Sequence, residues 1–391
     1  MQYGKLVGAL SVLVFIVLTF SISPAISALS NSYIISSTGQ IARNNVTARS
    51  GSPSDIQSAI NVVASAGGGN VYVPAGDFTF DYIGDYGVMV YGGVNIIGSG
   101  TAATILRSTR EPPTGSTMFY LDGSNGKPIR ISGIFFKGYV NATEDTSTEA
   151  VEVDSVKDFR IDHCRFEDFT SRAVGVGAGS RGIIDHCVFD NPYKERIGGD
   201  WGYGIIVWGD NIWRSMDYYL GQYDGKVNIA YIEDCTFSRC RYATAGNAGG
   251  WYVFRHNTVY ISPNYGSWAK SGIDVHEGGT SWPGGRGFEA YANTFYGTDA
   301  YQQAFKVRCG GGVVFNNTIS NIYEAVWLLK ADWTTSEQNY VKDLYIWSNT
   351  LSNVDLPISK DGFYQENIHY FLYARPGYIP YPYPHPLTVQ P

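Results

Sequence analysis

The chain has 391 residues, of which 44% are hydrophobic, enough to form a substantial core. Its formal net charge is −7 and it contains no basic run, which argues against nucleic-acid binding. The high contents of Gly (46) and Tyr (30) favour strands and turns over helices.

Residues 1–28 have the features of an export signal. A single lysine precedes an apolar run from Leu6 to Phe20, and small residues follow. The run is short for a membrane span and Pro24 follows it, which favours a cleaved signal peptide over a retained anchor that would contact the membrane. With either alternative, we expect the rest of the chain to be secreted or held at the cell surface.

A short amphipathic helix is predicted within residues 54–69, SDIQSAINVVASAGGG. Ser54 and Gln57 have the spacing of a capping box, and three glycines end the helix. Its apolar residues recur at helical spacing: Ile56, Ala59, Ile60 and Val63. Strand and turn phrases follow, so we expect the helix to cover the open end of a solenoid and to hide its exposed edge.

A six-residue phrase recurs through the middle of the chain. IDHCRF at 161–166 returns as IDHCVF at 184–189, and weaker copies follow. Each copy carries one anchor residue: Cys164, Cys187, Cys235, Asn257, Asn293, Asn317 or Asn349. Three of the gaps between anchors span 22 to 24 residues, a period typical of solenoid coils, and the longer gaps would hold insertions. We therefore expect the asparagines to hydrogen-bond along the axis and the phenylalanines to fill the interior.

Three of the five cysteines occupy the anchor column. They can be small buried column residues, or neighbouring coils can join them by a disulfide, because stacked strands lie about 4.8 Å apart. The sequence leaves both alternatives open. No Cys/His spacing resembles a zinc site.

The phrases DIQSAI (55–60), GGGNVYVPAG (67–76) and VNIIGSG (94–100) occur in this order before the repeats. Together with the coils they resemble right-handed parallel β-helix proteins of the pectate-lyase-like superfamily, over about residues 52–355. The resemblance implies an all-β solenoid, a right-handed parallel β-helix at 29–374 with an N-terminal capping helix. It does not imply one activity, because the superfamily contains lyases, hydrolases, epimerases and proteins with no known catalysis.

A second ladder precedes the first, with the pattern small, apolar, x, apolar, x, as in GIDVH (272–276) and AFKVR (304–308). The two x positions of a strand share its outward face. The residues predicted to face outward are, coil by coil, Glu152 and Asp154, Gly175 and Gly177, Ile206 and Trp208, Thr244 and Gly246, Asp274 and His276, Lys306 and Arg308, and Trp327 with Lys330 beyond it.

Two neighbouring coils thus present Asp274, His276, Lys306 and Arg308 together, which we predict to be catalytic residues. Elimination on an acidic polysaccharide needs a base beside the carboxylate and a cation that stabilises the developing charge. His276 or Lys306 would be the base, Arg308 would bind the carboxylate, and Asp274 would orient His276. The alternative is a surface salt-bridge patch.

Aromatic and basic residues on the same face are predicted to bind substrate: Trp208, Trp327 and Lys330. The aromatic-rich insertion at 201–223 can stack on sugars or pack against the coil. A hydrolase would need a carboxylate pair, which Asp274, Glu277 and Glu289 could supply.

A column of carboxylates is formed by Asp162, Asp185 and Glu233, with Arg255 following. Stacked carboxylates can bind Ca²⁺, the one cofactor that the sequence suggests, or Arg255 can neutralise its neighbour without a metal. The tail at 375–391 is too rich in proline to join a sheet, so we expect an extended arm.

The sequence thus predicts an exported, carbohydrate-active β-helix protein that binds an extracellular, acidic polysaccharide or cell-surface glycan. Cleavage by lyase- or hydrolase-type chemistry is left open. The alternative is a non-catalytic surface, adhesion or structural protein, in which the β-helix is a stiff rod.

Overall fold

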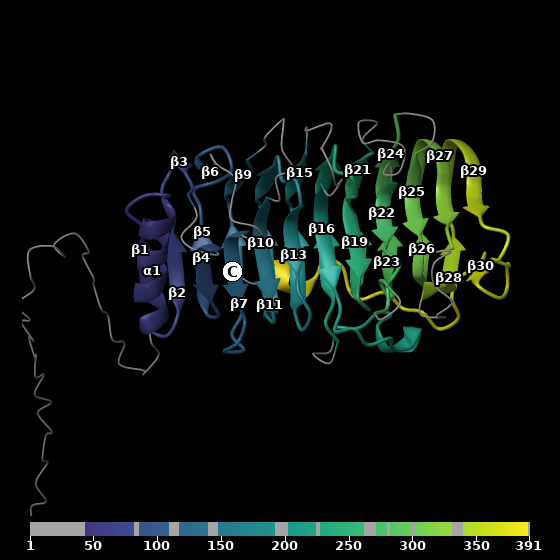
Figure 1. The fold of residues 1–391 in the computed structure, drawn as a ribbon, viewed down its shortest axis with the longest axis horizontal. Helices are drawn as coiled ribbons and strands as arrows, with labels where there is room; N and C mark the ends of the chain where they lie inside the picture. Colours follow the sequence, from purple (N-terminus) through teal and green to yellow (C-terminus); the bar gives the residue numbers. More distant parts are fainter. Residues whose placement is uncertain are drawn as a thin grey trace, which may run out of the picture. The chain divides into compact units, whose positions relative to one another are not determined.

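Each turn of the chain adds one strand to each of three parallel ladders (Figure 1). One coil consists of β22 (Ser271–Val275), β23 (Gly287–Tyr291) and β24 (Thr294–Tyr296). The next coil pairs with it in parallel through β25 (Gln303–Val307), β26 (Gly310–Phe315) and β27 (Thr318–Leu328). Repetition of this path produces a parallel β-helix.

The computed structural model describes residues 44–81, 86–108, 117–139, 148–191, 202–223, 227–261, 271–279, 282–298, 302–330 and 339–389. They belong to one unit, which begins at Arg43. The predicted signal peptide lies outside the described residues. Within them, no helix has both the length and the apolar character needed to cross a membrane.

The first ladder is a 12-stranded sheet. Besides β23 and β26 it contains β1 (Asn44–Thr47), β2 (Gly69–Tyr72), β5 (Val94–Ile97), β8 (Arg130–Ser132), β11 (Lys157–Asp162), β14 (Arg181–Asp185), β17 (Ala230–Glu233), β20 (Trp251–Arg255), β28 (Val341–Trp347) and β30 (Tyr370–Phe371).

The other two ladders are joined into an 18-stranded sheet because β27 and β29 (Thr350–Lys360) run through both. One contains β3 (Gly76–Thr79), β6 (Thr104–Arg107), β9 (Phe135–Lys137), β12 (Arg165–Glu167), β15 (Val188–Asp190), β18 (Thr236–Ser238), β21 (Thr258–Tyr260) and β24. The other contains β4 (Tyr86–Tyr91), β7 (Thr117–Asp122), β10 (Glu149–Asp154), β13 (Arg172–Val176), β16 (Tyr203–Trp208), β19 (Thr244–Asn247), β22 and β25. We call this last ladder the site face.

Stacked phenylalanines fill the interior, as predicted. The rings of Phe136, Phe166, Phe189 and Phe237 follow one another with centroids 5.2, 4.9 and 4.7 Å apart. All four are buried in one continuous core that extends through the coils. Burial of one aromatic ring per coil supplies much of the hydrophobic free energy of the fold.

The anchor column is also confirmed. Asn257, Asn293 and Asn317 each donate a side-chain hydrogen bond to the next asparagine, the last to Asn349, with N···O distances of 2.9 to 3.2 Å. The five cysteines are buried and free, so the disulfide alternative is wrong. The column thiols instead contact the backbone, as when the Cys187 amide donates to the Cys235 sulfur at 3.4 Å.

The residue before each anchor forms a tight bend. Its φ lies between 51° and 58° although none is glycine, at His163, His186, Asp234, His256, Ala292, Asn316 and Ser348. Histidine, aspartate and asparagine tolerate this left-handed region better than most residues. The recurrent histidines are therefore explained by backbone conformation and need no ligand.

The N-cap of helix α1 (Pro53–Ser65) is Ser52, two residues before the predicted cap Ser54. The hydroxyl of Ser52 accepts from the Asp55 amide at 3.3 Å, so the Ser54 capping box is wrong. Pro53 suits the first helical position because its missing N–H would have no partner there. Gln57 bonds the backbone N–H and carbonyl of Met89, which fixes α1 against β4.

The C-terminal segment from Arg375 returns over the 12-stranded sheet (the yellow chain leading from β30 to the C label in Figure 1). It forms no strand, in keeping with its proline content, and ends in a 3₁₀ turn, η3 (Pro386–Val389), beside β11 and β14. The Arg255 guanidinium donates to the Tyr381 and Pro382 carbonyls at 2.5 and 2.9 Å. Sequence reasoning predicted an extended arm but not its binding surface.

Candidate functional site

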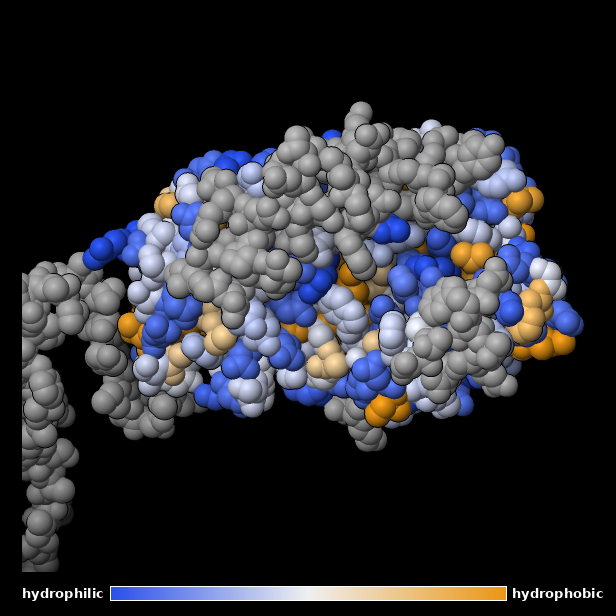
Figure 2. All heavy atoms as spheres, viewed as in Figure 1, coloured by the Kyte–Doolittle hydropathy of each residue, from blue (hydrophilic) through white to orange (hydrophobic). Residues whose placement is uncertain are grey.

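The predicted catalytic residues lie together on the site face. Asp274 of β22 pairs in register with Lys306 of β25, which pairs with Trp327 of β27. Figure 2, seen from the same side as Figure 1, shows strongly hydrophilic side chains gathered over β22 and β25. We call Asp274, His276, Glu277, Lys306, Arg308 and Arg241 the charged cluster.

Asp274 and Arg308 form the centre of the charged cluster. The guanidinium donates to both carboxylate oxygens at 3.0 and 2.5 Å, and the Asp274 side chain is completely buried. Burial acts to raise the pKa of Asp274, but the charge of Arg308, followed by His276, outweighs it and holds the pKa below its usual value. Asp274 is therefore an anion that serves as the partner of Arg308.

His276 is oriented by Glu277 and not by Asp274, contrary to the sequence prediction. Its Nδ1 lies 2.8 Å from the Glu277 backbone oxygen, which can only accept a hydrogen bond. Nδ1 therefore carries a proton, so in the neutral form of the ring the lone pair lies on Nε2. The Glu277 carboxylate is ion-paired with Arg308, whose guanidinium thus serves two carboxylates.

Lys306 is nearly buried, with 6% of its surface exposed, and its ammonium nitrogen lies 5.1 Å from the centre of the Trp327 ring. Burial lowers the pKa of Lys306, and Asp274 opposes this shift. A lysine with a lowered pKa exchanges a proton more readily near neutral pH.

Sequence reasoning missed Arg241 and Tyr242, and it considered Tyr203 only as part of the aromatic-rich insertion at 201–223. The Arg241 guanidinium lies 5.7 and 5.3 Å from the two tyrosine rings, and its buried Nε has no hydrogen-bond partner among the described residues. Burial raises the pKa of Tyr203 to about 12. Counting Lys306, Arg308 and Arg241 against Asp274 and Glu277, and leaving His276 out of the count, the charged cluster has a formal charge of +1.

The miss has a cause in the register of β19. The pattern YATAG was aligned so that Thr244 and Gly246 faced outward, but Ala245 is the residue that pairs with Ile206 and Asp274. Thr244 is fully buried. A shift of one residue turns a whole strand over, and it concealed that Arg241 and Tyr242 lead into the site.

The other predicted substrate-binding residues lie outside the charged cluster. Trp208 lies on β16, and the centre of its ring is 4.5 Å from the guanidinium carbon of Arg172 on β13. Lys330 donates its backbone N–H to Asp361, and its ammonium lies over the Tyr340 and Phe363 rings. Trp327 alone of the three is part of the same row as Asp274 and Lys306.

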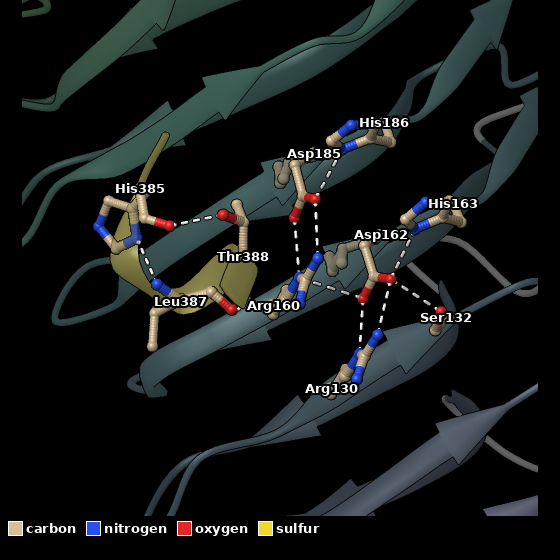
Figure 3. Close-up of polar contacts among 12 residues, drawn as sticks. Arg130, Ser132, Arg160, Asp162, His163, Asp185, His186, His385, Leu387 and Thr388 are labelled. Carbon is tan, nitrogen blue, oxygen red and sulfur yellow. Dashed lines mark hydrogen bonds and ion pairs between the residues drawn. The ribbon is translucent and has the colours of Figure 1, made fainter. Parts of the chain in front are cut away.

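The acidic column lies on the 12-stranded sheet and alternates with arginines, as Figure 3 shows. Arg130 donates to both Asp162 oxygens at 2.8 and 3.0 Å, and Arg160 to both Asp185 oxygens at 3.0 Å. Arg255 donates from Nε and Nη2 to one oxygen of Glu233, Oε1, and the other oxygen accepts from the His385 amide. We call the column the carboxylate–arginine ladder.

This ladder does not fit the predicted calcium site, because guanidinium groups already occupy the carboxylate oxygens. Among the residues that the structure describes, no three His, Cys, Asp or Glu side chains form a group that could hold a metal ion. Glu289 also lies on this sheet, where it accepts from the Tyr378 hydroxyl at 2.5 Å. It therefore does not form a hydrolase pair with Asp274 or Glu277.

The described part of the aromatic-rich insertion packs mainly on the 12-stranded sheet. Tyr219 stacks on Trp251 at 4.8 Å, and Tyr223 contacts Tyr231 and His385. Trp201 lies outside the described residues. These contacts agree with the self-packed alternative for Tyr219 and Tyr223.

The coils and the buried Asn and Phe columns define a right-handed parallel β-helix protein. The chain belongs to the family described as "right handed beta helix region", whose model matches residues 58–285. No curated protein matches the sequence.

Solved structures share the fold at low sequence identity. The A-module of a mannuronan C-5 epimerase from Azotobacter vinelandii is 12% identical with a TM-score of 0.53, covering 82% of this chain and 92% of that chain. A mutant tailspike protein of E. coli bacteriophage HK620, in complex with a pentasaccharide, is 15% identical with a TM-score of 0.59, covering 88% of this chain. This chain spans 62% of that tailspike chain.

Proposed function

We propose that the protein is exported and binds an acidic polysaccharide along the site face, where the charged cluster acts on a uronate residue. One observation carries the proposal: a net positive cluster, in a chain of net charge −7, holds a histidine whose Nε2 is available as a base. The Arg241 Nε without a partner is a donor for the sugar carboxylate. The structural neighbours support it, since one is a mannuronan epimerase and another binds a pentasaccharide.

The proposed chemistry begins with proton abstraction. His276 Nε2 takes the proton from the carbon beside the carboxylate, and Arg241 stabilises the charge that develops there. In elimination, the bond to the leaving glycosidic oxygen breaks, a carbon–carbon double bond forms, and the Lys306 ammonium protonates the leaving oxygen. Return of a proton to the opposite face of the same carbon, without bond cleavage, gives epimerisation.

The test is the His276→Gln variant, assayed on a panel of polyuronates and neutral glycans with Ca²⁺ or with a chelator. Absorbance of the unsaturated uronate reports elimination, and proton NMR of the sugar reports epimerisation. We expect the variant to lose at least about 100-fold in rate, the usual contribution of a general base. The matched control is His163→Gln, an exposed turn histidine on a different face, which should leave the rate unchanged.

Equal rates in the two variants would refute the role of His276. The rival function, a non-catalytic glycan-binding protein, is favoured by the mutual pairing of Asp274 and Arg308, as in a salt-bridge patch. Tight binding of a polyuronate with neither product would establish this rival.

A further inference from the structure

A second candidate site lies beside the 12-stranded sheet and shares no lining residue with the charged cluster. A cavity of about 370 Å³ opens between the segment at 213–217, Arg286 just before β23, Lys342 and Asp343 of β28, and Arg375 of the C-terminal segment. Its volume falls in the range of small-molecule sites, roughly 300–1,000 Å³. We call it the arginine pocket.

The lining of the arginine pocket is cationic. Its charged side chains are Arg214, Arg286, Lys342 and Arg375 against Asp217 and Asp343, a net charge of +2. The chain as a whole carries −7, so the pocket concentrates positive charge against the general trend. Such a concentration attracts anions.

Two of these guanidinium groups have hydrogen-bonding capacity that the protein does not use. Arg286 Nη1 and Arg375 Nε are buried and have no hydrogen-bond partner within the part of the chain that the structure describes. Arg286 is 1% exposed, and its nearest carboxylate, Asp343, is 3.8 Å away. Buried donors on a charged group are costly when unpaired, so a native structure that retains two of them in one pocket suggests a ligand.

Arg286 is also held rigidly. Its Nε donates to the Arg214 backbone oxygen at 2.6 Å, and its guanidinium lies 4.4 Å from the centre of the Trp213 ring. Burial lowers the pKa of Arg286, as expected for a cation that lacks a close counter-ion. The Arg286 guanidinium is thus fixed in position, and its positive charge is only partly balanced by a nearby carboxylate.

We propose that the arginine pocket binds a small organic carboxylate, such as a sugar acid, through Arg286 and Arg375. Guanidinium groups match the planar geometry of a carboxylate. The volume exceeds what a bare inorganic anion fills, which favours a ligand with an organic body. This proposal does not depend on the function proposed for the charged cluster.

The ligand would also fasten the C-terminal segment to the coils. Arg375 belongs to that segment and is ion-paired with Asp217 at 2.5 Å, whereas Arg286 precedes β23. A carboxylate between the two arginines joins them by charge-assisted hydrogen bonds. Binding should therefore slow amide hydrogen exchange in the segment that follows Arg375.

The test is calorimetric titration of the protein with sodium glucuronate, with glucose as the neutral match and with inorganic sulfate and phosphate. Performing it also in a Lys306→Met, Arg241→Gln background lowers the formal charge of the charged cluster from +1 to −1, which disfavours anion binding there. We expect glucuronate to bind in both backgrounds and glucose not to bind. Arg286→Lys should weaken glucuronate binding about tenfold or more, since lysine keeps the positive charge but cannot donate two parallel hydrogen bonds to a carboxylate.

Arg375→Gln should also weaken binding and abolish the protection from hydrogen exchange, which keeps the test decisive if the Arg286 variant does not fold. The control is Arg107→Lys. Arg107 of β6 forms an exposed ion pair with Asp77 of β3, so this substitution should leave glucuronate affinity and hydrogen exchange unchanged. Binding of sulfate or phosphate without glucuronate would overturn the carboxylate assignment. Absence of all binding, or unchanged affinity in both pocket variants, would overturn the site.

Discussion

The charged cluster and the carboxylate–arginine ladder are built in the same way, yet they differ in what remains available. Both pair Asp or Glu with Arg across neighbouring coils. On the 12-stranded sheet the remaining guanidinium N–H groups donate to the protein's own C-terminal segment, from Arg160 to Leu387 and from Arg255 to Tyr381 and Pro382. On the site face, Arg241 Nε and His276 Nε2 remain available.

This difference shows that a row of charged pairs does not by itself mark a functional site. Stacked coils bring charged residues together wherever the repeat places them, and cross-strand pairing then neutralises them. Unused hydrogen-bonding capacity is the more selective signal, because a protein seldom leaves buried donors unpaired. Buried guanidinium donors without a partner among the described residues occur on the site face and in the arginine pocket but not at Arg130, Arg160 or Arg255 of the ladder, although His385 Nε2 and Trp251 Nε1 on the ladder's sheet also have none.

The largest effect is expected from breaking the ladder. Arg255 and Glu233 are both fully buried, so Arg255→Met strands a carboxylate and should lower the free energy of unfolding by about 3–5 kcal/mol. Denaturant unfolding measures this loss, and limited proteolysis reports release of the C-terminal segment. Adding Glu233→Leu should restore part of the stability, because the stranded charge is gone. A loss below 1 kcal/mol would mean that the ladder is solvated.

Lowering the pH should weaken the packing of the C-terminal segment on the carboxylate–arginine ladder, because His385 becomes protonated. Burial and the charge of Arg255 lower its pKa to about 3, and it packs among Tyr223, Tyr231 and Tyr381. The folded state binds fewer protons than the unfolded state, so the His385 contribution is complete above pH 6.5 and declines as the pH falls toward 3. At pH 5 the loss should be about 2 kcal/mol.

Glu289 opposes this effect, since burial raises its pKa to about 7 and its stabilising contribution declines as the pH rises from about 4.5. The effect of His385 must therefore be measured as a difference. We expect the stability gap between the protein and a His385→Asn variant to narrow by about 2 kcal/mol from pH 7 to pH 5. Asparagine can still accept from the Leu387 amide, as His385 Nδ1 does at 3.2 Å. A gap that does not change with pH would contradict the assignment.

The smallest effect on stability is expected for Arg241, and it tests directly whether the charged cluster differs from the carboxylate–arginine ladder. The Arg241 Nε has no partner among the residues with a described structure, so Arg241→Gln should lower the free energy of unfolding by less than about 1 kcal/mol but weaken polyuronate affinity about tenfold. Calorimetry with a polyuronate and a denaturant titration measure the two quantities. The matched variant Arg130→Gln, which breaks a ladder pair with Asp162, should show the reverse pattern. Equal affinities in both variants would remove Arg241 from the site.

Much of this organisation could be predicted because a coil of fixed length turns sequence spacing into spatial contact. The anchors Asn257 and Asn293 and the stacked rings of Phe166 and Phe189 were predicted from their period alone. The gathering of Asp274 and Lys306 followed from the alternation of side chains along a strand. The register of β19 was missed because its small residues give no contrast between inward and outward positions.

The sequence by itself determined the coil, its interior columns and the residues that neighbouring coils present side by side, because these depend on local periodicity. Only the tertiary structure decided which partner each charge takes, so that Asp274 pairs with Arg308 and the Glu277 backbone orients His276. Only the tertiary structure, too, placed the C-terminal segment on the ladder and Arg375 in the arginine pocket. The contacts of the C-terminal segment, from Arg255 to Tyr381 and from Arg375 to Asp217, join residues more than a hundred positions apart. No repeat relates these residues, so their geometry depends on the shape of the whole folded surface.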